Sequence, residues 1–236
     1  MKGVFIIICG GDEAGRGAVL GPLVISVVAI KKEHEKKLSE IGVRDSKMLS
    51  SKKRYELYDK IKEVALEALT DSIYPNEINN AMKNSISLNE LEAVHFARLF
   101  DKIKRDTSIL YLDSPDVIAQ KFGMRISIYS TKPTRVIGIK VSREKGVKYT
   151  KIISEHKADS KYPVVSAASI IAKVTRDNEI KRLKDELNMD IGSGYPSDQT
   201  TIEAIKNNLK NEELLKHIRD RWSTIQGIRQ TKITNF

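Results

Sequence analysis

Short apolar runs alternate with longer amphipathic segments along the chain. Residues 4–9 and 23–30 are rich in Val and Ile, and a glycine-rich segment joins them, which predicts a pair of strands. Residues 109–113 form another run of this type, while residues 135–141 and 148–155 alternate between apolar and polar side chains. These segments together predict a β-sheet.

Helical spacing marks the longer segments. Residues 51–69 carry apolar side chains at this spacing, and a second helix is predicted from a capping box at residues 87–90 to residue 103. Residues 164–187 predict a long helix that is apolar nearly all round as far as Val174 and amphipathic afterwards. Such a helix begins in the core and ends at the surface. Residues 115–130 fit a helix and a strand equally well.

The C-terminal part of the chain differs from the rest. After a glycine-rich segment at residues 192–198 it is polar and helical, with apolar stripes at helical spacing. We therefore expect an α/β domain over residues 1–187, followed by a helical segment and tail over residues 188–236.

Charge favours a polyanionic partner. The 236 residues include 41 Lys and Arg against 31 Asp and Glu, a formal net charge of +10. Nucleic acid is the first expectation and an anionic membrane surface the second. No apolar run is long enough to span a bilayer, so no membrane insertion is predicted. The single cysteine, Cys9, excludes a disulfide framework within the chain and is typical of a cytoplasmic protein.

Acidic residues follow the predicted strands. Asp12 and Glu13 follow the first, Asp113 ends the third, and Asp159 lies between the last strand and the long helix. In an α/β sheet, strand ends converge on one edge, where ligands bind. Clustered carboxylates repel one another unless cations lie among them, and oxygen ligands suit Mg²⁺ or Mn²⁺. Two such ions can clamp a phosphodiester, which together with the basic charge predicts a nuclease.

Each acid also has a simpler interpretation. A single aspartate often caps a helix or lies in a surface turn. Adjacent residues of a strand point to opposite faces, so Asp12 and Glu13 share a site only if the strand bends or ends there. Gly10, Gly11 and Gly15 make such a bend or end possible.

Five motifs occur in a fixed order: DEAGRG (12–17), DSK (45–47), YLDSPD (111–116), EHKADSKYPVVSAASIIAKVTRD (155–177) and GSGYPSD (192–198). In these motifs the chain resembles the type 2 ribonucleases H, specifically ribonuclease HII in its archaeal form. The resemblance implies a ribonuclease H-like mixed β-sheet flanked by helices, with a C-terminal helical segment. It also implies hydrolysis of the RNA strand of RNA–DNA hybrids and cutting at ribonucleotides embedded in duplex DNA, leaving 3′-hydroxyl and 5′-phosphate ends.

The resemblance also implies roles for individual residues. The four acids would be the metal ligands, with Mg²⁺ or Mn²⁺ as the cofactor. Backbone groups of Gly15, Arg16 and Gly17 would read the ribose 2′-hydroxyl, which distinguishes RNA from DNA. Tyr195 would pack on the sugar at the junction between ribonucleotide and deoxyribonucleotide, and Lys47 would contact a phosphate. Without the resemblance, Tyr195 is a turn aromatic and Lys47 a solvated lysine.

Two further features carry weaker expectations. Gln230, Ile233 and Phe236 have the spacing of the motif by which replication proteins bind the sliding clamp, although the chain stops after one aromatic residue. The alternative is a frayed basic tail. His156 is expected to be structural and to satisfy itself with a single hydrogen bond, the alternatives being a proton carrier or a substrate contact.

Two other functions remain to be weighed. A non-catalytic nucleic-acid-binding protein of the same fold has no reason to retain four mutually repelling carboxylates. A nucleotide-binding loop at residues 10–17 lacks both the Gly-Lys-Ser/Thr ending and a regular G-x-G-x-x-G.

Overall fold

The computed structural model describes residues 5–43, 49–140 and 146–233. The chain forms two compact units that are interleaved along the sequence. Unit 1 comprises Met1–Glu13, Ile25–Asp71 and Asn89–Val174, and unit 2 comprises Ala14–Val24, Ser72–Leu88 and Thr175–Phe236. The division of the chain after residue 187 stays a prediction.

Within the described residues the strands form one six-stranded sheet in the order β3-β2-β1-β4-β6-β5. The strands are β1 (Ile7–Ala14), β2 (Leu23–Lys31), β3 (Glu67–Ile73), β4 (Thr107–Asp113), β5 (Thr134–Val136) and β6 (Thr150–Glu155). Strand β4 runs parallel to both β1 and β6, and β5 runs parallel to β6. The predicted α/β fold with a mixed sheet is confirmed.

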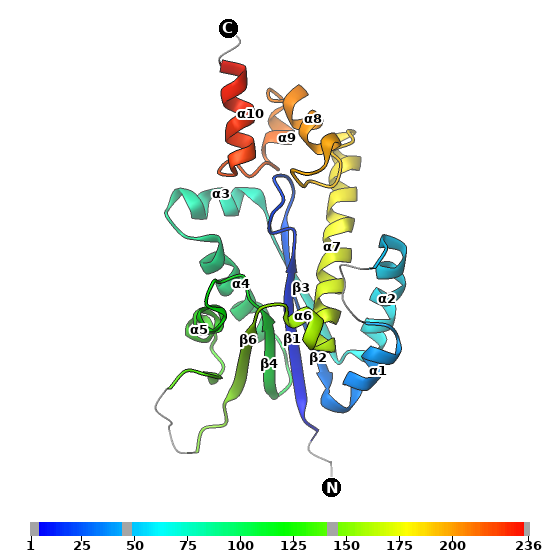
Figure 1. Cartoon of the computed structure of the whole chain (residues 1–236), viewed down its shortest axis with the longest axis vertical. Coiled ribbons are helices and arrows are strands. Elements are labelled where there is room, and N and C mark those ends of the chain that lie inside the picture. The colour runs from blue at the N-terminus through cyan, green and yellow to red at the C-terminus, as the bar shows by residue number, and fades with distance from the viewer. Residues whose placement is uncertain (1–4, 44–48, 141–145, 234–236) are drawn as a thin grey trace. The chain divides into compact units, whose positions relative to one another are not determined.

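Helices cover both faces of this sheet (Figure 1). Alternate side chains of β1 point to opposite faces. Ile7 and Cys9 join a core with α4 (Leu88–Asp101) and α5 (Ala119–Tyr129). Ile8 faces the other way, into a core with α1 (Glu35–Glu40), α2 (Ser51–Val64) and the first half of α7 (Pro163–Leu187).

One glycine of β1 allows α7 to approach the sheet closely. A Cβ on Gly10 would lie 2.4 Å from both the carbonyl carbon and the carbonyl oxygen of Val164. Any side chain there would push the start of α7 away from β1. The glycine that sequence analysis assigned to a bend is therefore needed for packing, two residues before Asp12.

Unit 2 has its own apolar core. Unit 2 as a whole contains α3 (Pro75–Lys83), α8 (Gln199–Asn207), α9 (Glu212–Leu215) and α10 (Ser223–Ile233), together with the C-terminal half of α7. Leu20, Ile180 and Ile218 are among its buried side chains. The helices after residue 188 form the predicted C-terminal helical segment. No helix in the described parts of the chain is long and apolar enough to cross a lipid bilayer.

The structure corrects three predicted boundaries. The first strand continues to Ala14 and so includes both acids. The helix predicted to reach residue 69 ends at Val64, because the next residues turn extended and Leu66 donates a hydrogen bond to the carbonyl of Ala29 in β2. Strand β5 is shorter than predicted, since Gly138 has a φ of 89°. The ambiguous segment at residues 115–130 contains a helix, α5.

Candidate active site

Asp12 and Glu13 lie within β1. The sequence analysis placed them after the end of this strand, so the strand is longer than predicted. Asp12 is 5% exposed, while Glu13 is half-buried, as opposite orientations in a strand require. The Asp12 carboxylate accepts a hydrogen bond from the backbone N–H of Glu13 at 2.8 Å. The strand ends one residue after this pair, at Ala14, and the charge of Glu13 acts on the Asp12 carboxylate.

Asp113 ends β4, beside the acids of β1. Gly11 of β1 pairs with Leu112 of β4 in the parallel register, so Asp12 and Asp113 are the next residues on neighbouring strands. Asp113 Oδ1 accepts a hydrogen bond from the backbone N–H of Ala158 at 2.8 Å. This contact ties the end of β4 to the start of the helix that follows β6.

That helix, α6 (Ala158–Lys161), carries Asp159. Asp159 is only 2% exposed and lines a surface depression with Ser39, Ser160 and Ser166. The predicted acids thus come from β1, β4 and α6 at one edge of the sheet in unit 1. In the part of the chain that is described, no group of three or more Asp, Glu, His or Cys side chains is close enough together to form a complete metal site.

Negative charge is unfavourable at this edge of the sheet when no cation is bound. Burial raises the pKa of Asp12 well above its ordinary value, and the negative charges of Glu13 and Asp113 raise it further. A hydrogen bond with Ser169 of α7 acts in the opposite direction. Positive charge among these carboxylates would relieve the repulsion. Oxygen is their only donor atom, so the residues fit Mg²⁺ or Mn²⁺.

The GRG segment belongs to unit 2, and its two glycines differ. Gly15 has a φ of 89°, and a Cβ there would lie 2.3 Å from Nε of Arg176. Gly17 is exposed and has no atom within 4 Å of its Cβ position. Gly15 is therefore required by the fold of unit 2, whereas the fold itself does not require Gly17.

Tyr195 also lies in unit 2 and stacks on a buried arginine. The guanidinium carbon of Arg176 lies 4.4 Å from the centroid of the Tyr195 ring. Arg176 also donates from Nη2 to the carbonyl of Ser193 at 3.0 Å. It is 3% exposed, and burial lowers its pKa below the ordinary value. Tyr195 therefore packs on the charged residue whose side chain also lies against Gly15, and its contact with a sugar stays a prediction.

Sequence analysis assigned no role to Ser169 or Arg176. Both lie in the quoted motif of residues 155–177, where a serine and an arginine in an apolar helix were the available signal. Lys47 and Phe236 lie outside the described residues. Gln230 is exposed on α10, and Ile233 is the last residue of that helix.

Comparison with known proteins decides the family. The model of the family described as ribonuclease HII matches residues 9–225, a span that includes all four carboxylates, Gly15 to Gly17 and Tyr195. The chain belongs to the ribonuclease HII family. It is therefore an endonuclease of the ribonuclease H type, a hydrolase of phosphodiester bonds in RNA.

Individual relatives agree with this assignment. Ribonuclease HII of Thermococcus sibiricus is 41% identical over 222 residues, covering 94% of this chain and 90% of the relative. The crystal structure of ribonuclease H2 from Pyrococcus horikoshii OT3 has a TM-score of 0.79 at 36% identity, covering 96% of this chain and 98% of that one. The PCNA:RNase HII complex from Archaeoglobus fulgidus has a TM-score of 0.76 at 35% identity, covering 92% and 96%.

A more distant structure shares the fold. Bst-RNase HIII in complex with Mn²⁺ has a TM-score of 0.75 at 18% identity, covering 96% of this chain and 70% of that chain. The fold of this chain is therefore shared by a protein with little sequence in common with it.

Proposed function

We propose that this ribonuclease HII hydrolyses the RNA strand of RNA–DNA hybrids and cuts at ribonucleotides embedded in duplex DNA, leaving 3′-hydroxyl and 5′-phosphate ends. The observation that carries the proposal is the burial of Asp12 next to Glu13, at the position on β1 that lies beside Asp113 of β4. A fold that buries a carboxylate among like charges loses stability unless the charge serves a ligand. The net charge of +10 suits a nucleic-acid duplex as the substrate.

In this proposal Asp12, Glu13, Asp113 and Asp159 hold two Mg²⁺ or Mn²⁺ ions. When bound, such ions would supply positive charge for the scissile phosphate and would make a water molecule more acidic. The protein's contribution is orientation: the N–H of Ala158 directs one carboxylate oxygen of Asp113, and Ser169 bonds to Asp12. These contacts limit how far the carboxylates rotate when the phosphate approaches.

Unit 2 would supply recognition of the ribose. Gly17 is exposed and open, so the backbone around Arg16 can approach a sugar and read its 2′-hydroxyl. The ring of Tyr195, supported by Arg176, would pack on the adjacent sugar. Lys47 would contact a phosphate. The enzyme would act in the cytoplasm, consistent with a single, buried cysteine.

The Archaeoglobus fulgidus relative in complex with PCNA supports a further partner. We extend the proposal to a tail contact with the sliding clamp through Gln230, Ile233 and Phe236. Clamp binding would bring the enzyme to replicating or repaired DNA without changing its active site.

The proposal is tested with three labelled duplexes: all-DNA, an RNA–DNA hybrid, and DNA with one ribonucleotide. Each is incubated with Mg²⁺, with Mn²⁺ and with a chelator. Cutting is expected only in strands that contain ribonucleotides and only with metal, and it should be lost in Asp12→Asn. Asp59→Asn, at an exposed aspartate of α2, is the matched control and should cut normally. Binding without cutting under every condition would favour the non-catalytic alternative.

A further inference from the structure

Two segments of unit 1 that carry candidate ligands are joined at three points. Ser114 donates its backbone N–H to the carbonyl of Glu155 at 3.0 Å. His156 Nε2 lies 2.7 Å from the carbonyl oxygen of Asp116, and the N–H of Ala158 bonds to Asp113. We call these three hydrogen bonds the clasp. It links the loop after β4 to the turn between β6 and α6.

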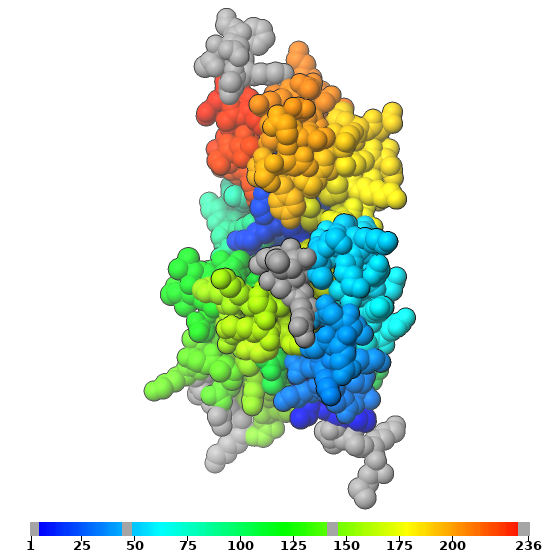
Figure 2. Space-filling view, turned by 45° about the vertical axis from the view of Figure 1, so that its right-hand side comes forward, coloured from blue at the N-terminus to red at the C-terminus, as the bar shows by residue number. Residues whose placement is uncertain are grey.

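The imidazole bond defines the tautomer of His156. A backbone carbonyl can only accept a hydrogen bond, so Nε2 must carry the proton. The His156 side chain is exposed, and the lime-coloured atoms of the segment around it reach the surface beside the green atoms of α5 (Figure 2). An exposed histidine that is held by one directional bond does not serve the packing of the core.

The backbone next to His156 has an uncommon conformation. Lys157 has a φ of 56°, in the left-handed region that residues other than glycine seldom adopt. This conformation lets the chain turn between the side chain of His156 and the N–H of Ala158, which face the same loop. Asp159 follows directly. The turn therefore sets the position of one candidate ligand while it bonds to another.

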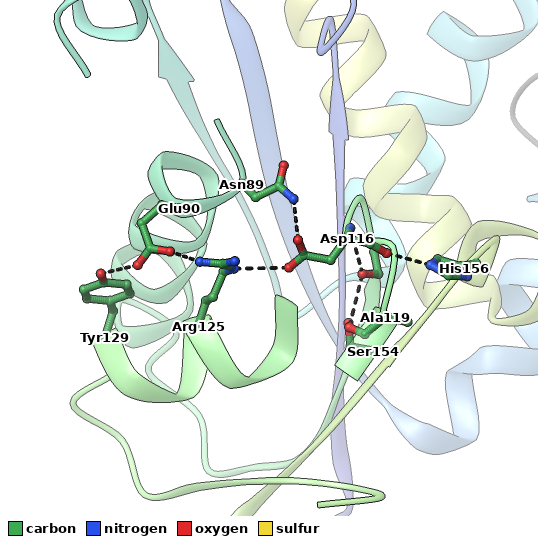
Figure 3. A network of polar contacts seen from close by, with 9 residues as sticks. Asn89, Glu90, Asp116, Ala119, Arg125, Tyr129, Ser154 and His156 are labelled. Atoms are coloured by element: carbon green, nitrogen blue, oxygen red, sulfur yellow. Dashed lines mark hydrogen bonds and ion pairs between the residues drawn. The ribbon is translucent and has the colours of Figure 1, made fainter. Parts of the chain in front are cut away.

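The loop that His156 holds is anchored on its other side (Figure 3). The Asp116 carboxylate accepts hydrogen bonds from the Asn89 amide and from Nε of Arg125, the latter at 3.2 Å. Arg125 is also paired with Glu90, which accepts a hydrogen bond from the Tyr129 hydroxyl. Asp116 is thus bound to α4 and α5 through its side chain and to the β6–α6 turn through its carbonyl.

We infer that His156 is a positioning residue that fixes Asp113 relative to Asp159. This inference rests on the proposed function, in which both aspartates bind metal. Two carboxylates brought to one metal site repel each other before the metal binds, so the segments that carry them need a restraint between them. Outer contacts of this kind orient the ligands of metal sites, and their loss usually costs about 10- to 100-fold in activity or affinity.

Three substitutions of His156 separate the hydrogen bond from other roles. The amide nitrogen of Gln can occupy the place of Nε2, whereas the shorter Asn places its amide near Nδ1 and cannot reach the Asp116 carbonyl. We expect His156→Ala and His156→Asn to lower kcat on a hybrid duplex about tenfold and to raise the Mg²⁺ concentration for half-maximal activity by a similar factor. KM for the duplex should not change, and His156→Gln should recover most of the rate.

A matched control is available at His34→Ala. His34 also bonds to a backbone carbonyl, with Nδ1 at 3.3 Å from the oxygen of Val64. It lies beyond β2, where Lys32 pairs with Ile6 at the opposite end of β1 from the acids. Wild-type kcat is expected for this variant.

The outcomes are distinguishable. If wild type cuts no hybrid under any metal condition, the proposed function fails. If wild type cuts but His156→Ala keeps its kcat, raises only KM, or is no slower than His156→Gln, the inference alone is wrong. The nitrogen NMR spectrum of the wild-type imidazole gives a readout independent of the variants. A proton on Nε2 is expected, and a neutral ring with its proton on Nδ1 would contradict the clasp.

Discussion

The carboxylate edge of unit 1 and the recognition loops of unit 2 differ in their energetics: the first contains an unfavourable buried charge, and the second is held by hydrogen bonds. The carboxylate edge comprises Asp12, Glu13, Asp113 and Asp159, and there burial and like charge raise the pKa of Asp12. The recognition loops, residues 15–17 and 193–195, are well paired: the N–H groups of residues 19 and 20 both donate to the carbonyl of Gly194. The Gly194 N–H in turn donates to the hydroxyl of Thr201 at 2.9 Å.

This difference separates two kinds of functional residue. A group that serves a charged ligand costs stability until the ligand arrives, so it is visible as an electrostatic penalty. A group that serves shape must be held in place before the substrate arrives, so it is visible through the hydrogen bonds that hold its backbone. Experiments that measure stability and activity together should therefore give opposite results for the two regions.

The largest effect is expected at the carboxylate edge. Asp12→Asn should reduce activity well beyond the roughly 100-fold that loss of an outer-shell contact costs. The same variant should raise Tm in metal-free buffer, because it removes a buried charge; each kcal/mol gained corresponds to about 2–4 °C. Calorimetry and hybrid cleavage measure the two effects. A lower Tm would show that Asp12 is structural.

The pH dependence of stability provides a second test of the same penalty. Since the pKa of Asp12 is raised in the folded state, the native protein retains a proton that the unfolded chain loses as pH rises through 3.8. This group's contribution to stability therefore falls as pH rises above that value and levels off above the native pKa. Metal-free wild type should show this decline in denaturant titrations, and Asp12→Asn should show a smaller one. Identical profiles would argue against the penalty.

Two glycines of the recognition loops sharpen the comparison. Gly15→Ala should destabilise the protein by about 1–3 kcal/mol through its positive φ, with further loss from the clash with Arg176. Gly17→Ala has open space around it and should leave Tm unchanged. Its KM for ribonucleotide-containing duplex should rise about tenfold, equivalent to roughly 1.4 kcal/mol. If both variants keep wild-type KM, the backbone there does not read the ribose.

A smaller effect on KM is expected from substitution of Arg176, the residue on which Tyr195 packs. Arg176→Lys keeps the positive charge but loses the planar stack on Tyr195, which is worth about 0.5–2 kcal/mol. KM should rise roughly two- to 30-fold, since about 1.4 kcal/mol corresponds to a factor of ten. Tyr195→Ala should have a similar effect, and the double variant should be no worse than either single one, as in a coupled pair. Additive effects would mean that the two residues act separately.

The smallest effect on hydrolysis is expected at the C-terminus. Deleting residues 230–236 should leave kcat and KM on free duplex unchanged, because these residues are assigned to clamp binding alone. Affinity for the sliding clamp, measured by calorimetry, should fall. Unchanged clamp affinity would refute this part of the proposal, and Phe236→Ala in the full-length chain tests it without shortening α10.

Local pattern was sufficient for much of the fold. The alternation in β6, the continuous apolar run of β2 and the helical spacing of α7 are properties of neighbouring residues, and the elements follow them closely. The acids were also identified from local order alone, as carboxylates that follow apolar runs. An ionised group beside a buried strand is unusual enough on energetic grounds to mark a candidate site.

Residues distant in sequence decided the rest. Residues 67–69 fit the preceding helix, but pairing with β2 draws them into the sheet. The roles of Arg176 and His156 depend on Tyr195 and Asp116, which lie 19 and 40 positions away, respectively. Periodicity reports which face of an element is buried, but a hydrogen bond or a ring stack depends on which two elements the fold brings together. That pairing is a property of the tertiary structure.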